Sequence, residues 1–512
     1  MAQIIYSKKI KKIVDLYDGL IVSCLEIKEG LEENQLDLIE NKIKEIKIKL
    51  MNSLDVDELG ELVETLYNIH QDINRLLIEF TYNRDLELLN KVINILQDLK
   101  DNLEVEFRYK ALLPTYMKKF KCIASNCEES CCKGWRVLVD QDSYQLYQQI
   151  EDEGLKKTIN NNIKINKSDE NNSSYAYIKL KEDNSCPFLT KDELCNIHLK
   201  KGENYLCDTC AIYPRTTINL VDNILEVSAT MSCPEIRRLA LLNKSGIKFE
   251  YVNDYLFDRN VNINFNTEKI KDNNPKKYFK EIRSLSIGLL QNREYSLKER
   301  LIFLGIICNS LEKNIQNDKV EDISEVIDYY KMLNKNKFNF DISKISSKED
   351  IQIQILNKII NMKINNNINN NYFSKLKEAI KGITIAGESL EESVNRYRES
   401  YRVYYKLFMQ QHEYLLENYL VNYIFKNLFP LGSDKSLFDE YVLFIIHYSI
   451  IKMLLIGLSA FHKGLSVEVV IDLIGTFSRV LEHDSSYFKS VYEFIKENEF
   501  DTLAYMTVLI KN

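Results

Sequence analysis

Nine of the 11 cysteines lie between positions 122 and 233, and this cluster is the strongest chemical feature of the 512-residue sequence. The order along the chain is Cys122, Cys127, Cys131, Cys132, Cys186, Cys195, Cys207, Cys210 and Cys233. Close spacing lets one loop present several thiolates to one metal ion, and distant members can close the site across the fold. Spacing alone leaves zinc and iron–sulfur open, and nine thiols suffice for one four-iron cluster with spare thiols or for two sites. The competing interpretation is a set of buried free thiols.

Composition and charge exclude several other classes of protein. The formal net charge is −7, which argues against a nucleic-acid binder held by phosphate contacts. The sequence has no GxGxxG, GxxxxGK[ST] or GxSxG motif, so a P-loop kinase, a typical dehydrogenase and an α/β-hydrolase are not expected. The N-terminus has no signal peptide, which predicts a cytoplasmic protein with reduced thiols. The apolar stretch 442–461 contains His447 and Lys452, so we expect a buried helix and no membrane insertion.

The elements that must position the cysteines are mostly helices. Residues 7–106 read as four helices with short connections; in the second, Leu36, Ile39, Ile43, Ile46 and Leu50 form one apolar stripe. Residues 270–510 also show helical periodicity, interrupted by an asparagine-rich loop or linker at 358–372. Segments 136–139, 175–180 and 224–227 have strand composition. We therefore predict a mainly α chain: a four-helix antiparallel bundle (1–105), a cysteine-rich metal-binding α+β domain with little β (112–245) and a helical C-terminal domain (246–512).

The bundle resembles the flagellin export chaperone family FliS. The resemblance rests on Leu16–Leu20 (LYDGL), Gly60–Leu62, Leu66–Tyr67 and the short turn Asn83–Asp85. Members of that family are helical bundles that bind the C-terminal segment of flagellin. The resemblance implies that residues 1–105 bind flagellin.

The rest of the chain resembles the flagellin lysine N-methylase family FliB. Four blocks carry the resemblance in order: CCKGW at 131–135, CPFL at 186–189, CAIYPR at 210–215 and SCPE at 232–235. The stretch 417–430, ENYLVNYIFKNLFP, is similar to the family's C-terminal motif. The resemblance implies methyl transfer from S-adenosylmethionine to flagellin lysines, with an iron–sulfur cluster of the 4Fe-4S type as cofactor and zinc as the alternative. Carried onto this sequence, it implies metal ligands at eight cysteines and leaves Cys207 outside the pattern: Cys122, Cys127, Cys131, Cys132, Cys186, Cys195, Cys210 and Cys233.

Methylation of an amine by a polar route needs a neutral lysine and an acceptor for its proton. Tyr213, Asp140 and Glu235 are candidate acceptors close to the cysteine motifs, with structural roles as the competing interpretation. Arg215 could pair with the carboxylate of S-adenosylmethionine or cap a helix. Glu413 and Glu417 lie one turn apart, as in a cationic-ligand site or an ordinary solvated helix face. The CxxxCxxC motif of radical enzymes is absent, and the sequence does not choose between polar and radical transfer.

Two functions from different classes follow. The first is a methyltransferase acting on flagellin lysines, with a fused chaperone-like bundle that captures the substrate. The second is a non-catalytic metal-binding flagellin chaperone or redox sensor. Binding of S-adenosylmethionine distinguishes them.

Overall fold

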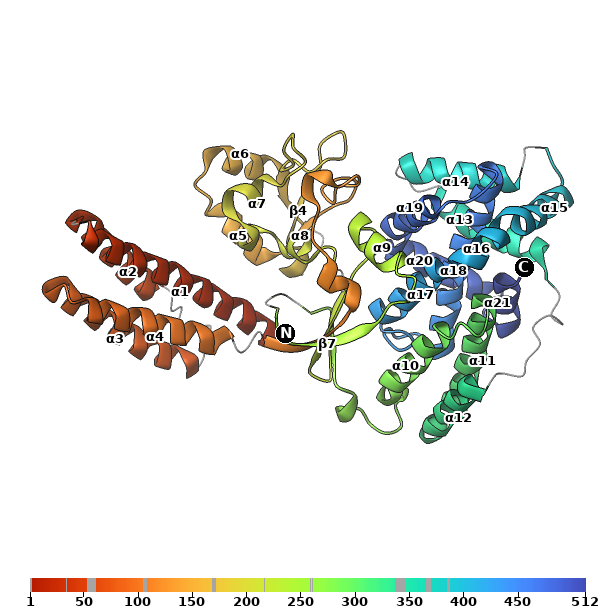
Figure 1. The fold of residues 1–512 in the computed structure, drawn as a ribbon, viewed down its shortest axis with the longest axis horizontal. Coiled ribbons are helices and arrows are strands. Elements are labelled where there is room, and N and C mark those ends of the chain that lie inside the picture. The colour runs from red at the N-terminus through yellow and green to blue at the C-terminus, as the bar shows by residue number, and fades with distance from the viewer. Residues whose placement is uncertain are drawn as a thin grey trace. The chain divides into compact units, whose positions relative to one another are not determined.

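The computed structural model describes residues 2–512 apart from 34, 53–60, 105–107, 168–171, 216, 258, 260, 337–346, 365–369 and 385–386. The chain divides into two compact units. The first comprises Met1–Ala111, Asn223–Leu225 and Tyr251–Val261. The second comprises Leu112–Asp222, Glu226–Glu250 and Asn262–Asn512. As predicted, the fold is mainly helical, with a small amount of β-structure in the middle of the chain (Figure 1).

The N-terminal helices form the predicted four-helix bundle. They are α1 (Ala2–Glu32), α2 (Leu36–Asn52), α3 (Glu61–Asn83) and α4 (Leu86–Glu104). Helix α1 packs against α2 and α4, and α3 packs against α4. The stripe of α2 is buried at Ile39, Ile43, Ile46 and Leu50, but Leu36 is exposed because it begins the helix. Gly60, which carries part of the FliS resemblance, lies outside the described residues.

Two small sheets occupy the middle of the chain. The larger has the order β7-β1-β6-β5-β8, from β7 (Phe249–Leu256), β1 (Arg108–Pro114), β6 (Ile224–Ser228), β5 (Thr217–Val221) and β8 (Ile263–Phe265). Strands β5 and β8 run parallel, with Asn219 opposite Ile263. The smaller sheet places β4 (Ala176–Ile178) between β2 (Leu138–Val139) and β3 (Ile163–Ile165), and both pairs are antiparallel. The three predicted strands correspond to β2, β4 and β6, whereas β1, β3, β5, β7 and β8 were not predicted.

Short helices follow the strands of the smaller sheet, and several cysteines lie in or directly before them. They are α5 (Gln141–Gln148), α6 (Glu153–Asn162), α7 (Asn196–Lys201) and α8 (Asp208–Ile212), followed in sequence by α9 (Pro234–Leu241). A compact hydrophobic cluster lies beneath them and includes Tyr147, Phe188 and Ile197. Cysteines 195, 207 and 233 directly precede α7, α8 and α9, so three thiols occupy N-cap positions.

The C-terminal region is helical. Its helices are α10 (Phe279–Leu290), α11 (Leu297–Gln316), α12 (Ile323–Asn336), α13 (Glu349–Ile364), α14 (Asn370–Ile383), α15 (Leu390–Ser400), α16 (Lys406–His412), α17 (Tyr414–Lys426), α18 (Leu437–Phe461), α19 (Val467–Phe477), α20 (Ser485–Glu497) and α21 (Leu503–Ile510). Two π-helices, Tyr401–Tyr405 and Ser478–Glu482, continue α15 and α19. The predicted loop at 358–372 is shorter than expected, because α13 and α14 extend into it; residues 365–369 lie outside the described part.

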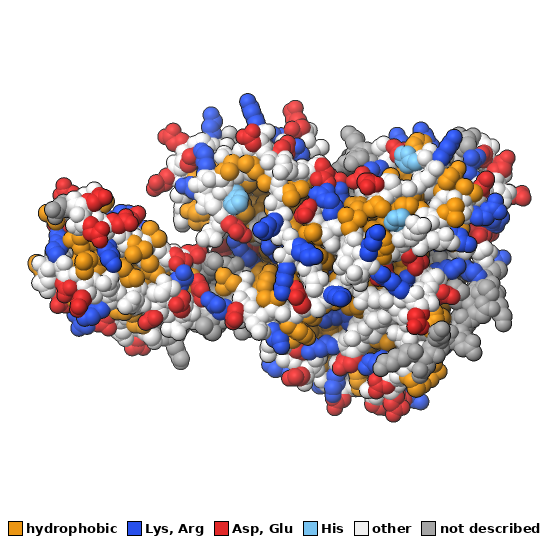
Figure 2. Space-filling view, viewed as in Figure 1, with side chains coloured by type: hydrophobic (Ala, Val, Ile, Leu, Met, Phe, Trp, Pro, Cys, Tyr) orange, Lys and Arg blue, Asp and Glu red, His pale blue; other side chains and the backbone are white. Residues whose placement is uncertain are grey.

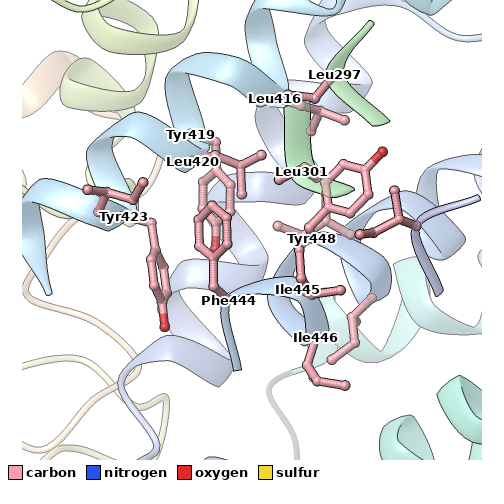
Figure 3. Packing of buried hydrophobic residues seen from close by; sticks show 14 of the residues in the cluster. Leu297, Leu301, Leu416, Tyr419, Leu420, Tyr423, Phe444, Ile445, Ile446 and Tyr448 are labelled. Carbon is pink, nitrogen blue, oxygen red and sulfur yellow. The ribbon is translucent and has the colours of Figure 1, made fainter. Parts of the chain in front are cut away.

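Helix α18 is the centre of this region. By length and composition it could cross a membrane, yet its apolar stretch is entirely buried inside the protein. Lys452 on this helix donates a hydrogen bond to the carbonyl of Ile510 (2.6 Å). Figure 3 shows Tyr419 and Tyr423 of α17 packed beside Phe444 of α18, as expected for core residues.

Candidate functional site

The cysteine region places its thiols in two neighbouring groups. Electrostatic interactions link Cys127 with Cys122, Cys131 and Cys233. A second set links Cys186, Cys195, Cys207 and Cys210. Cys132 lies between the groups, since it interacts with both Cys131 and Cys210. All the cysteines are free thiols in this structure.

Six of these thiols have a raised pKa, which favours the protonated state in the absence of a cation: Cys127, Cys131, Cys186, Cys195, Cys210 and Cys233. Burial raises the pKa of both Cys186 and Cys233 to about 11, and nearby thiols contribute in the same direction. A hydrogen bond with Cys132, together with burial, raises the pKa of Cys131. A bound metal ion would reverse this preference, because metal ligation requires the thiolate. The donor chemistry therefore suits a thiophilic metal.

The positions of the thiols are less favourable for binding a metal ion than their chemistry. Within the described part of the chain, no group of three or more His, Cys, Asp or Glu side chains is placed to hold a metal ion. The eight predicted ligands thus come close together without forming a coordination shell. We therefore derive no reaction step through a metal.

Cys207 is a residue that the family pattern left out. It is 1% exposed, and its backbone N–H donates to the Tyr147 hydroxyl (3.0 Å). A hydrogen bond between the Cys207 and Cys210 side chains is the largest cause of the raised pKa of Cys210. The structure therefore includes Cys207 in the second thiol group. The short Cys207-x2-Cys210 spacing was the signal in the sequence that could have placed it there.

Two of the predicted proton acceptors have structural roles. Asp140 caps α5: its carboxylate accepts hydrogen bonds from the Ser143 backbone N–H (3.0 Å) and hydroxyl (2.8 Å). The same carboxylate accepts from the Asp208 N–H (2.9 Å) and so joins α5 to α8. Glu235 accepts from the guanidinium of Arg238, at 3.3 and 3.1 Å. A carboxylate occupied in this way is a poor candidate for accepting a proton from a substrate.

Tyr213 is the predicted acceptor that the structure connects to further polar groups. Its ring lies 5.8 Å from that of Trp135, and its hydroxyl lies 3.3 Å from Ser232 Oγ. Burial raises the pKa of Tyr213, so the phenol is protonated at neutral pH. Arg215, two residues after Tyr213, is half-buried, and its backbone N–H donates a hydrogen bond to the carbonyl of Ile212 (2.8 Å).

The π-helix Ser478–Glu482 and the next residue, His483, supply three polar residues near Ser232 that no sequence motif indicated. Arg479 donates to the carbonyl of Ser232 (3.1 Å), and His483 Nε2 lies 3.2 Å from Ser232 Oγ. Glu482 accepts hydrogen bonds from Tyr419 (2.5 Å) and Lys426 (2.7 Å). Burial alone would raise the pKa of Glu482, but the Lys426 ammonium outweighs it and lowers the pKa to about 2. π-helices occur frequently at functional sites.

A buried ion pair holds the first cysteine loop against the helices. Arg237 of α9 is 1% exposed and makes two hydrogen bonds to the Glu129 carboxylate, at 3.0 and 2.9 Å. Arg479 also pairs with Glu129 (3.1 Å). Glu129 lies between Cys127 and Cys131, so this clamp fixes the loop that presents both thiols. Gly475 leaves room for it, since a Cβ there would lie 1.9 Å from Arg237 Nη1.

The polar residues of the 417–430 motif serve to position α17. Glu417 is buried and pairs with Arg293 (2.8 Å) and Arg300 (2.7 Å). Asn418 donates to three carbonyls at and beyond the end of α9, and Asn422 donates to the carbonyl of Ala229 (3.1 Å). The expectation of a solvated helix face is wrong for Glu417. Its carboxylate is committed to two arginines, which also argues against a cationic-ligand site.

The comparisons with known proteins agree with this architecture. A model of the FliB lysine N-methylase C-terminal domain matches residues 283–509, and a model of the flagellar protein FliS matches residues 2–104. The flagellar biosynthetic protein FliU of Salmonella muenchen is 32% identical over 124 residues, which are 24% of this chain and 72% of FliU. A lysine-N-methylase of Salmonella typhimurium is 31% identical over 124 residues, which are 24% of this chain and 30% of that protein. No solved structure matches the chain.

These matches place the chain in the class of lysine N-methylases that carry a fused FliS-like bundle. The predicted resemblances are thereby confirmed at both ends of the chain. The chain belongs to the FliB lysine N-methylase family.

Proposed function

We propose that this protein is an S-adenosylmethionine-dependent lysine N-methyltransferase that acts on flagellin in the cytoplasm. The observation that carries the proposal is the presence of both matches on one chain: a FliS bundle at residues 2–104 and a FliB methylase domain at 283–509. The two matches cover different parts of the chain, and each indicates a flagellar function independently of the other. In this proposal the bundle captures the substrate and the second unit modifies it.

The bundle offers a surface suited to an amphipathic segment. Several of its large apolar side chains are exposed, and they are Val22, Leu25, Leu36, Leu38, Ile48, Met51, Tyr67, Ile78, Tyr82 and Leu86. Figure 2 shows such apolar side chains lying between charged ones on the bundle. A helical flagellin segment could bury its apolar face against them. A short tether then raises the local substrate concentration to about millimolar.

The chemistry of the second unit is methyl transfer to nitrogen. S-adenosylmethionine supplies the methyl group on a sulfonium when it is bound. The protein must bind the lysine side chain, remove it from bulk water and accept its proton, because only the neutral amine is nucleophilic. Trp135 and Tyr213 present an aromatic pair beside the first thiol group, and the Tyr213 hydroxyl leads to Ser232. We assign the lysine side chain to this place.

We also propose that the cysteine region takes up a thiophilic metal, an iron–sulfur cluster or zinc. The support is chemical: nine free thiols occur in two adjoining groups, and burial and neighbouring thiols raise the pKa of several of them, Cys186 and Cys210 included, in the absence of a cation. Metal content and the absorption spectrum of protein purified without oxygen test this directly. A metal-free, colourless protein with full activity would contradict it.

The test of the main proposal is intact-mass spectrometry of flagellin after incubation with the purified full-length protein. Methyl transfer adds about 14 Da per event and requires S-adenosylmethionine, as expected for group transfer from a cofactor. A Tyr213→Phe variant should be strongly impaired, whereas a Tyr251→Phe variant, changed at an exposed position, should match the wild type. No mass increase with tight flagellin binding would favour the non-catalytic chaperone or redox sensor instead.

A further inference from the structure

Ser232 is a buried hydroxyl with an unusually complete set of polar neighbours. It is 2% exposed, and its Oγ lies 3.3 Å from the Tyr213 hydroxyl, 3.1 Å from Thr230 Oγ1 and 3.2 Å from His483 Nε2. His483 is an exposed residue, and its contact with the buried Ser232 hydroxyl is partly buried. Tyr213, Ser232 and His483 therefore form a chain of hydrogen-bonded side chains. It runs from Tyr213, beside Trp135, to the exposed His483.

These hydrogen bonds allow a set of donor directions that runs from Tyr213 through Ser232 to His483. A serine hydroxyl has one proton to donate and two lone pairs that accept. Tyr213 and Thr230 each carry their own proton and can fill both lone pairs of Ser232. The proton of Ser232 is then available to the unprotonated Nε2 of a neutral His483. Protonation of His483 reverses the last bond, because Nε2 then becomes a donor.

We propose that Tyr213, Ser232 and His483 form a proton relay that carries the proton of the substrate lysine ammonium to His483. The N–H bond of the ammonium breaks and its proton passes to the Tyr213 oxygen, whose own proton moves to Ser232. The proton of Ser232 moves to His483 Nε2. The lysine becomes a neutral amine and His483 an imidazolium, which then releases its proton to water. Tyr213 and Ser232 each lose one proton and gain another, so His483 is the group that changes charge.

The surroundings of His483 keep it ready to accept a proton. Its charged neighbours are Lys426 of α17 and Arg479 and Glu482 of the π-helix. Partial burial lowers the pKa of His483, and the two cations act in the same direction, whereas Glu482 opposes them. His483 is therefore neutral at pH 7. The separations of 3.2 and 3.3 Å are longer than an ideal O–H hydrogen bond, as is common in the absence of substrate.

This inference rests on the proposed function, and the experiment separates the two. The rate of flagellin methylation by the full-length protein is measured as a function of pH for the wild type and for His483→Gln. The glutamine can keep a hydrogen bond to Ser232 but cannot take up a proton. We expect kcat/KM at pH 7 to fall about 100-fold. The wild-type rate should decline at a pH below the ordinary histidine value as His483 becomes protonated, and the variant should lose this dependence.

Controls distinguish the relay from a structural effect. Added imidazole should restore activity to His483→Gln, because it can act as the missing acceptor, and should leave the wild type unchanged. His462→Gln alters another partly exposed histidine, one paired with Glu378 (3.3 Å), and should behave as the wild type. Ser232→Ala should be as slow as His483→Gln, and the double variant no slower.

Either of two results would overturn the relay. One is a His483→Gln protein with the wild-type rate and pH profile. The other is a slow variant that imidazole does not restore, which would indicate a structural role for His483. Absence of methylation by the wild type itself would instead refute the proposed function.

Discussion

Replacing Glu129 by alanine should selectively loosen the loop that carries Cys127 and Cys131. Arg237 would lose its two hydrogen bonds to Glu129 while its side chain stays buried at 1% exposure. Removing one partner of a buried ion pair destabilises by about 3–5 kcal/mol. We take the lower end, about 3 kcal/mol, because the Glu129 side chain is 18% exposed and Asp472 remains 3.4 Å from Arg237. The folded-to-unfolded ratio should therefore fall more than 100-fold.

The sequence provides its own probe for this measurement. Trp135 is the only tryptophan, and its Nε1 donates to the carbonyl of Cys131 (2.6 Å), so its fluorescence reports on this loop during urea unfolding. The matched control is Glu128→Ala: the neighbouring glutamate pairs with Arg238, but their side chains are 48% and 35% exposed. An exposed pair contributes less than about 1 kcal/mol. Equal losses of stability in the two variants would refute the argument that burial makes the Arg237–Glu129 pair important.

Three further predictions concern other parts of the chain. Gly475→Ala should displace Arg237 and lower the stability to urea, since the added Cβ would lie 1.9 Å from its Nη1, whereas Gly288→Ala, where a Cβ meets nothing within 4 Å, should cause no loss of stability. His70 is buried and bonded to the Tyr17 hydroxyl (2.8 Å), and burial lowers its pKa to about 4. As the pH falls, the histidine of the unfolded chain is protonated before His70 of the folded chain. The free energy of unfolding of the bundle is therefore constant above pH 6.5 and falls by about 3 kcal/mol toward pH 4. Unfolding followed by circular dichroism should show that His70→Gln lacks this pH-dependent loss. Deleting residues 1–105 should raise the KM for flagellin more than it lowers kcat, and equal kcat/KM in steady-state assays would contradict substrate delivery by the bundle.

Apolar periodicity predicted the bundle because its helices bury one stripe each. Ile39, Ile43 and Ile46 repeat at three- and four-residue intervals, and all three are buried. The same apolar pattern could not distinguish positions in the core from exposed positions that are available to bind another molecule. Tyr67 belongs to the motif that indicated the FliS family, yet it is 53% exposed. Its exposure becomes informative only when the packing of the neighbouring helices is known.

The polar arrangement around Ser232 was beyond sequence reasoning for a different reason. Ser232 and His483 are 251 positions apart, and a π-helix brings them together. A π-helix shifts the side chains that follow it relative to a regular helix, and no local composition marks the region 478–482. Tyr213 was found through its motif, but its connection to His483 depends on how α9 and α19 pack.

The 417–430 motif shows how a helix without catalytic groups can still determine the site. Asn418 holds the end of α9, whose N-terminus carries Cys233, and Tyr419 and Lys426 hold Glu482 at the end of the π-helix. Both segments that converge on Ser232 are therefore fixed by α17. A residue that anchors two such segments resists substitution even though it touches no substrate, because a displacement of about 1 Å at a reacting group can reduce the rate about 100-fold. We infer that this motif acts by positioning, and that chemistry depends on the residues it aligns.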